Sequence, residues 1–202
     1  MAKKKKKSII EKVAQDLFSK FGFFKTTVDE IAKAARIGKA TIYYYFEGKE
    51  DIFKEVVEKE SRILNAKIKE AVNQEDTPEK KIRAFILTRA KHLNELANIY
   101  SALKDDVLKK FDFIEKIREK DFKKEMEIIQ KILKEGIEKK NFMIEDIELT
   151  SFAIISALKG LEYPWPPRIS LPEVEKNIDK LLEVFFHGIV KRELFQEKII
   201  KK

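Results

Sequence analysis

Hydrogen-bond donors crowd the segment from Lys39 to Tyr45, where five of the seven side chains carry one: Lys39, Thr41, Tyr43, Tyr44 and Tyr45. Ammonium and hydroxyl groups donate to phosphate oxygens and to base edges, which is the chemistry of nucleic-acid recognition. Ile42 and Phe46 stand four residues apart, the spacing of one buried face of a helix. Because only one face can be buried, at least one of the three consecutive tyrosines must be exposed, and the others can pack in the core.

A second helix is predicted directly before this segment. Thr27 is a good N-cap, and Glu30, three residues later, completes a capping box. An apolar stripe at helical spacing follows, formed by Ile31, Ala32 and Ala35. The break at residues 36–38 has room only for a turn. Two helices across so short a turn form a helix-turn-helix, whose second helix lies in the DNA major groove.

The first 55 residues or so closely resemble the TetR (tetracycline-repressor-like) family of transcriptional regulators. The resemblance is carried by residue types at fixed spacing: Phe21, Gly22, Thr26, Thr27, Ile31, Ala32, Ala35, Lys39, Thr41, Tyr43, Phe46, Lys49 and Glu50. Two positions depart from the family pattern. Arg36 stands where glycine is usual, so we expect a slightly strained turn there. Gly38 stands where serine is usual, which removes a helix cap worth a few tenths to about 1 kcal/mol.

The resemblance implies a role for each exposed donor of the motif. Thr27, Tyr43, Tyr45 and Lys49 are expected to contact phosphates, with Lys49 near the amides of a helix N-terminus that attracts anions. The residues expected to face the bases are Lys39, Ala40, Thr41 and Tyr44. Lys39 could then donate to guanine O6 and N7, and Ala40 could pack on a thymine methyl group.

Positive charge is concentrated at the same end of the chain. Residues 1–50 hold 12 lysines and arginines against 6 acidic residues, whereas the remaining 152 hold 31 against 29. Most of the excess comes from the run Lys3 to Lys7. We interpret this run as an arm that follows phosphates or the minor groove and adds affinity without specificity. The alternative is a solvated tail.

The rest of the chain shows helical patterns and no convincing strand. We therefore predict an all-α fold of about nine helices, with an N-terminal helix-turn-helix domain at 1–50 and a C-terminal helical domain at 51–202. A helix over about 49–73 links the two. The other helices are expected at about 6–21, 79–96, 99–108, 113–139, 147–161 and from 171 onward.

Family resemblance implies that the C-terminal domain binds a ligand and forms a dimer. Arg89 and His92 lie on or beside one apolar stripe, and Phe122, Met126 and Ile129 could form an opposing wall. One buried cation in an aromatic pocket would suit an amphipathic or acidic small molecule. The alternative is that these side chains are ordinary core and that Arg89 extends its charge to solvent.

The last two helices are predicted to form a homodimer interface, because together they would make a four-helix bundle with their copies. Small residues that permit close approach lie on the first helix, and a wide apolar face lies on the second: Ala153, Ala157 and Gly160, then Leu181, Leu182, Phe185 and Ile189. The alternative is that both faces are satisfied within one chain.

Several other classes of protein are disfavoured. The chain has no cysteine, two distant histidines and six glycines without a phosphate-loop pattern, so we expect no catalytic residue, metal or cofactor and no enzymatic activity. No apolar run is long enough to span a membrane, and a cytoplasmic protein is expected. The function predicted is a DNA-binding transcriptional regulator, specifically a repressor released from a palindromic operator by a small molecule. The alternative is an architectural DNA-binding protein without a ligand.

Overall fold

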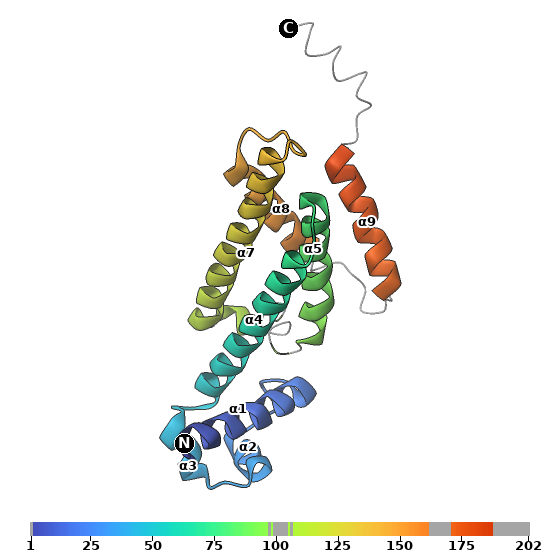
Figure 1. The fold of residues 1–202 in the computed structure, drawn as a ribbon. Coiled ribbons are helices and arrows are strands. Elements are labelled where there is room, and N and C mark those ends of the chain that lie inside the picture. The colour runs from blue at the N-terminus through green and yellow to red at the C-terminus, as the bar shows by residue number, and fades with distance from the viewer. Residues whose placement is uncertain (1, 97, 99–104, 106, 162–170, 188–202) are drawn as a thin grey trace, which may run out of the picture.

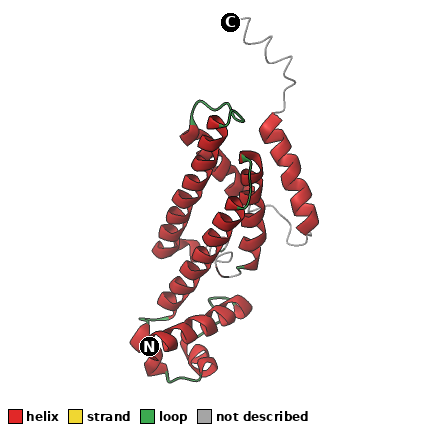
Figure 2. Cartoon of the chain, viewed as in Figure 1, coloured by secondary structure: helices red, strands yellow, loops and turns green. Residues whose placement is uncertain are grey.

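The computed structural model describes residues 2–96, 98, 105, 107–161 and 171–187. Within this part of the chain it has eight α-helices, one short 3₁₀ helix and no strand, which confirms the all-α prediction (Figures 1 and 2). The elements are α1 (Ala2–Phe21), α2 (Val28–Ala35), α3 (Lys39–Tyr45), α4 (Lys49–Asn73), α5 (Pro78–Glu95), η1 (Leu108–Lys110), α7 (Asp112–Glu138), α8 (Ile147–Leu161) and α9 (Leu171–His187). Most of the helix predicted at 99–108 lies outside the described residues.

Helices α1, α2 and α3 form a small unit at one end of the molecule, and α4 runs from it into a helical bundle (Figure 1). With 25 residues, α4 is about 37 Å long at 1.5 Å per residue. Helix α1 begins at Ala2, so the run Lys3 to Lys7 forms its first turns. The run is therefore part of a helix, and its contact with phosphates or the minor groove stays a prediction.

An aromatic cluster joins the N-terminal unit to the bundle. The Phe53 ring of α4 lies 5.2 Å from Phe18 of α1 and 4.8 Å from Phe23 of the following turn, between ring centroids. Phe111 and Phe113 approach the same cluster from the start of α7, at 5.7 Å from Phe23 and 6.5 Å from Phe53. Since α4 contributes to the cores on both sides, the division at residue 50 stays a prediction.

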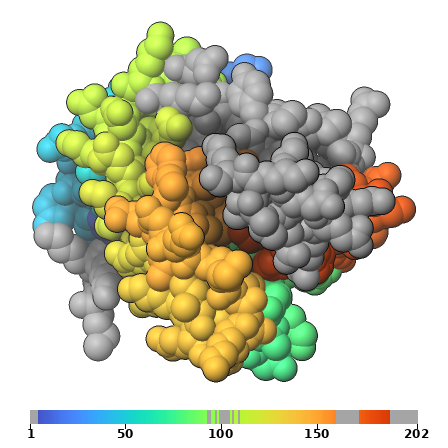
Figure 3. All heavy atoms as spheres, turned by 90° about the horizontal axis from the view of Figure 1, so that it is seen from above, coloured from blue at the N-terminus to red at the C-terminus, as the bar shows by residue number. Residues whose placement is uncertain are grey.

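In the bundle, α5 packs beside α4 and α7, while α8 packs on α7 and α9 on α5. Thr77 caps α5 and Pro78 opens it. Viewed from the end opposite the N-terminal unit, α8 lies at the surface beside the end of α7 (Figure 3). No helix in the described part of the chain is both long and apolar enough to cross a bilayer.

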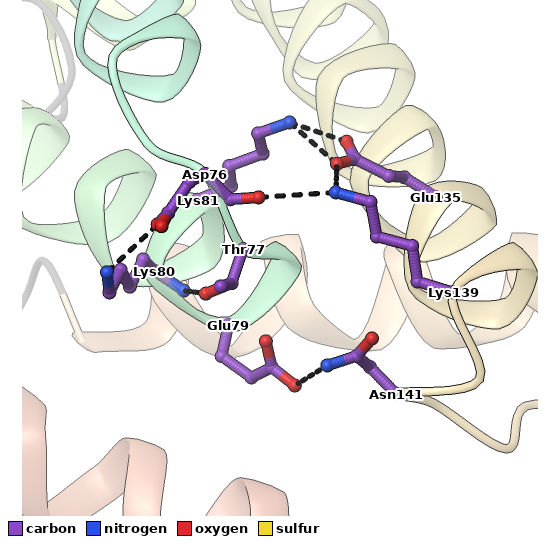
Figure 4. Close-up of polar contacts among 8 residues, drawn as sticks. All are labelled: Asp76, Thr77, Glu79, Lys80, Lys81, Glu135, Lys139 and Asn141. Carbon is purple, nitrogen blue, oxygen red and sulfur yellow. Dashed lines mark hydrogen bonds and ion pairs between the residues drawn. The ribbon is translucent and has the colours of Figure 1, made fainter.

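Ionic contacts tie the turn between α4 and α5 to the C-terminal end of α7 (Figure 4). The Lys81 ammonium lies 2.8 and 2.6 Å from the two carboxylate oxygens of Glu135. Lys139 donates to the same carboxylate at 2.8 Å and to the backbone oxygen of Asp76 at 3.2 Å. Its proximity to Lys139 and Lys81 lowers the pKa of Glu135. These contacts hold three helices in register at the end of the bundle farthest from α3.

Candidate nucleic-acid interface and effector region

The start of α2 is fixed by the predicted capping box. The Glu30 amide donates to Thr27 Oγ1 at 3.2 Å, and the Thr27 amide donates to Glu30 Oε2 at 2.8 Å. This bond, together with one from the Thr27 hydroxyl, lowers the pKa of Glu30. Behind it, Thr26 is buried and its hydroxyl donates to the Gly22 carbonyl at 2.9 Å. The two threonines therefore anchor the first helix of the motif to the end of α1.

The turn between α2 and α3 has the predicted left-handed residue. Arg36 adopts φ 55° and ψ 44° and caps the C-terminus of α2. The next amide, of Ile37, donates to Ala32 O at 3.1 Å and closes the turn. Gly38 is the N-cap of α3 and supplies no side-chain hydrogen bond, as expected. An L-residue in this region is disfavoured, so the turn stores a little strain.

Helix α3 presents its donors as the sequence predicted. Ile42 is fully buried, while Tyr43 and Tyr44 are 51% and 64% exposed. Tyr45 is half-buried and packs on the core, with its ring 5.0 Å from that of Tyr44. Ala40 is exposed, and Thr41 is partly buried. The exposed face therefore carries two tyrosines, and the third is divided between core and surface.

Two of the predicted DNA-binding lysines have partners within the protein. Lys39 lies 2.9 Å from Asp29 of α2, and this hydrogen bond raises the pKa of Lys39. Lys49 donates to the Phe23 carbonyl at 3.0 Å and lies 4.4 Å above the Phe23 ring. Both ammonium groups would have to exchange these contacts for DNA. Asp29 was not among the predicted site residues, because its pairing with Lys39 depends on how α2 and α3 pack.

The last lysine of the N-terminal run contacts the linking helix. Lys7 lies 3.0 Å from Glu55 of α4 and 3.8 Å from Glu11 of α1. Its ammonium is also 5.3 Å from the centre of the Phe46 ring. The hydrogen bond with Glu55 raises the pKa of Lys7. Lys7 therefore helps to join α1 to α4, whereas the side chains of Lys5 and Lys6 are exposed.

Comparison with known proteins agrees with this geometry. A model for bacterial regulatory proteins of the tetR family matches residues 10–56, which span the helix-turn-helix. These residues have the sequence pattern of the TetR-family DNA-binding domain. It is 26% identical over 190 residues to the uncharacterized HTH-type transcriptional regulator YhgD of Bacillus subtilis, covering 89% of this chain and 94% of that protein. It is 29% identical over 189 residues to the HTH-type transcriptional regulator QacR of Staphylococcus aureus, covering 89% and 95%.

The fold also matches solved structures along most of its length. The transcriptional regulator FadR of Bacillus subtilis, crystallised with stearoyl-CoA, superposes with a TM-score of 0.73 at 21% identity. The match covers 91% of this chain and 99% of that one. At this level of identity the similarity establishes the fold. The helical bundle that follows the DNA-binding motif therefore has the same architecture as that regulator.

The cation of the predicted effector pocket is paired with a carboxylate of the protein. Arg89 is buried, and its Nε lies 2.8 Å from Oε1 of Glu125, which is also buried. Arg89 is therefore a buried cation, as the prediction requires, but the sequence did not show that Glu125 of α7 would pair with it. An acidic ligand would have to compete with Glu125 for the guanidinium.

The other predicted pocket residues differ in their surroundings. His92 is partly buried and contacts Glu95 and, at 2.9 Å, the ammonium of Lys67. Phe122 and Met126 are half-buried, with the Phe122 ring 5.8 Å from Phe152 of α8. Ile129 is completely buried and belongs to the core. Phe122 and Met126 therefore remain the better candidates for contact with a ligand.

An open groove of about 660 Å³ lies elsewhere, between α5 and α9. Leu182 and Phe186 line it, and Arg83 crosses it to Asp179 with distances of 2.6 and 2.9 Å. This bidentate contact lowers the pKa of Asp179. Of the described residues that line the groove, none is among the five predicted for the effector pocket.

Helices α8 and α9 each carry a second apolar face. The exposed side chains are Leu149 and Phe152 on α8 and Leu181, Val184 and Phe185 on α9. Ala153 and Ala157 are exposed beside Phe152. Leu182 is buried and turns toward α5, so the prediction that placed it in the dimer interface was wrong. Ile189 lies outside the described residues, and so do the surroundings of Gly160.

Proposed function

We propose that this regulator is a homodimeric repressor that binds a palindromic operator and leaves it when a small molecule enters the C-terminal domain. The observation that carries the proposal is α4, one continuous helix of 25 residues that starts next to α3 and ends in the bundle. A displacement of its far end turns the N-terminal domain. Two recognition helices must meet successive major grooves about 34–36 Å apart, so such a turn weakens operator binding.

On this proposal the exposed surface of α2 and α3 contacts the operator. Thr27, Tyr43 and Tyr45 are assigned to phosphates together with Lys49, and the base readers are Lys39, Ala40, Thr41 and Tyr44. Phosphate contacts position the protein and base contacts specify the sequence. The Lys39–Asp29 ion pair is exposed on both sides, so exchanging it for a base costs little.

The exposed apolar faces of α8 and α9 support the proposed dimer. Leu181 and Phe185 lie one helical turn apart, and Phe152 offers a similar surface on α8. Ala153 and Ala157 beside it permit close approach of a second helix. Exposed apolar side chains gathered on two helices are typical of a protein–protein interface. A four-helix bundle made from two copies would cover it.

We propose an amphipathic small molecule as the effector, bound between α5, α7 and α8 near Phe122 and Met126. The FadR of Bacillus subtilis, which shares the fold, was crystallised with stearoyl-CoA, so this architecture can hold an amphipathic ligand. The Arg89–Glu125 pair gives the region one polar point in an apolar setting. The polar group of an amphipathic ligand would form hydrogen bonds with that pair, and its apolar part would pack on Phe122.

Selection of DNA from a random library by the purified protein tests the DNA-binding part. A two-fold symmetric site is expected, and random sequence bound as well as any selected sequence would instead indicate an architectural protein. Candidate amphipathic molecules are then screened for release of the selected site. Thermodynamic linkage requires the DNA to weaken ligand binding by the same factor by which the ligand weakens DNA binding. Met126→Trp, which fills the proposed site, should abolish the ligand response and leave DNA affinity unchanged.

A further inference from the structure

A buried carboxylate stands where the N-terminal domain meets the bundle. Glu60 of α4 is only 2% exposed. Its Oε1 accepts a hydrogen bond from the side-chain amide of Gln15 in α1 at 2.9 Å. The same oxygen accepts from the side-chain amide of Asn98, which follows α5, at 2.7 Å, and Oε2 accepts from the Asn98 backbone amide at 3.1 Å. One carboxylate therefore gathers donors from two separate parts of the chain.

Gln15 and Asn98 are also joined directly. The Asn98 side-chain amide donates to the Gln15 backbone oxygen at 3.2 Å, although the two residues are 83 positions apart. Asn98 is itself only 2% exposed, and Lys59 donates to the side-chain oxygen of Gln15 at 3.2 Å. We call Gln15, Glu60 and Asn98 the Glu60 cluster. It links α1 of the DNA-binding domain, the linking helix α4 and Asn98.

These contacts restrain an angle that apolar packing leaves loose. Burial of apolar surface is non-directional, so the Phe18 and Phe53 rings tolerate some sliding of α1 over α4. Hydrogen bonds to a buried carboxylate are short and directional, and losing one leaves a charge in a poorly solvated place. The other ion pair described between α1 and α4, Lys7–Glu55, is about one-third exposed on both sides and restrains the angle weakly.

We propose that Glu60 is a positioning residue that fixes the DNA-binding domain at one angle to the bundle, and so sets the operator spacing that the dimer accepts. The inference rests on the proposed dimeric repressor. Asn98 follows α5 of the bundle along the chain, so a ligand that displaces Asn98 withdraws two of the three hydrogen bonds to Glu60 described above. The domain then occupies a range of angles, and the two recognition helices no longer match a single spacing.

Distance measurements between spin labels test the angle without DNA. The chain has no cysteine, so labels can be placed on Ser19→Cys in α1 and Lys131→Cys in α7, both exposed. The labelled protein is mixed with excess unlabelled protein, so that a labelled chain pairs with an unlabelled partner and the distance measured is the one within a single chain. Glu60→Gln, which keeps the shape and removes the charge, should broaden or shift the distance distribution. Gln15→Ala, which removes the donor from α1, should do the same.

The adjacent residue Ser61 provides a matched control. It is equally buried in α4, but its hydroxyl bonds Asp121 of α7 at 2.6 and 2.7 Å and has no described contact with α1. Ser61→Ala should leave the distribution as narrow as in the parent. If Glu60→Gln and Gln15→Ala also leave it unchanged, Glu60 does not set the angle and the proposal is overturned.

Operator spacing gives the second measurement. The parent should prefer its selected spacing over one longer by a base pair by about fivefold or more, the lower end of typical coupling between sites. Glu60→Gln should reduce this preference to about twofold or less while the half-site sequence stays the same. An equal loss of affinity at all spacings would indicate a structural role only and overturn the proposal. A parent that selects no symmetric site refutes the repressor instead, and the label distances still decide the role of Glu60.

Discussion

Gly136 of α7 leaves room for the aromatic ring of Phe142, and we predict that replacing this glycine with alanine destabilises the protein. A Cβ atom at this position would lie 2.0, 2.5 and 2.8 Å from Cδ2, Cε2 and Cγ of Phe142. Those distances are far inside van der Waals contact. The Phe142 ring stacks on Phe186 of α9, with centroids 6.0 Å apart and planes at 16°. In Gly136→Ala the ring must therefore leave, and α9 loses a contact with the body of the domain.

The sign of the effect follows from three terms. Alanine in a helix interior is about 1 kcal/mol more favourable than glycine. Displacing the Phe142 ring forfeits an aromatic pair worth about 0.5–1.5 kcal/mol. It also exposes part of a half-buried phenyl group. We take the free energy lost there as about half of the 1.5–3 kcal/mol that full burial of such a side chain contributes. The losses exceed the gain, so Gly136→Ala should lower the free energy of unfolding by about 1 kcal/mol.

Removing the ring reverses that sign. In the Phe142→Ala background the space beside Gly136 is empty, and Gly136→Ala should then raise the free energy of unfolding by about 1 kcal/mol. Urea unfolding followed by circular dichroism, at a fixed protein concentration, measures all four members of the cycle. If Gly136→Ala stabilises the protein equally in both backgrounds, the ring does not depend on the glycine and the reasoning is refuted.

Three further predictions concern other parts of the chain. Arg36→Gly should raise the free energy of unfolding by about 0.5–1 kcal/mol, because glycine adopts φ 55° without strain, and an unchanged urea midpoint would contradict this. Leu181→Glu with Phe185→Glu should convert dimers to monomers in sedimentation at micromolar concentration; a dimer that persists would place the interface elsewhere. The pKa of Glu30 lies below its usual 4.5 when folded, so its stabilisation is present above that pH and is lost as the pH falls through the lowered pKa. Denaturation midpoints should therefore fall faster below pH 4.5 in the parent than in Glu30→Gln, and parallel curves would show that the capping box does not contribute.

Local sequence determined most of the DNA-binding motif. The capping box of Thr27 and Glu30, the left-handed Arg36 and the uncapped Gly38 all depend on residues within four positions of one another. The burial of Ile42 beside exposed tyrosines follows from helical periodicity in the same way. Such features need no knowledge of the rest of the fold, because the helix backbone itself brings residues at i and i+3 or i+4 together.

Tertiary structure decided the pairings between helices. The partner of Arg89 is Glu125, 36 residues away, and the partner of Lys39 is Asp29 of the preceding helix. Nothing in the pattern of α9 distinguished Leu182, which is buried on α5, from Leu181, which is exposed.

The Glu60 cluster shows the same limit most clearly, since its three members come from parts of the chain that no sequence period connects. Charged and apolar residues recur on several faces of these lysine- and glutamate-rich helices. Which face meets which neighbour depends on the rotation and crossing angle of each packed pair, and these are set by the fit of all the side chains between them.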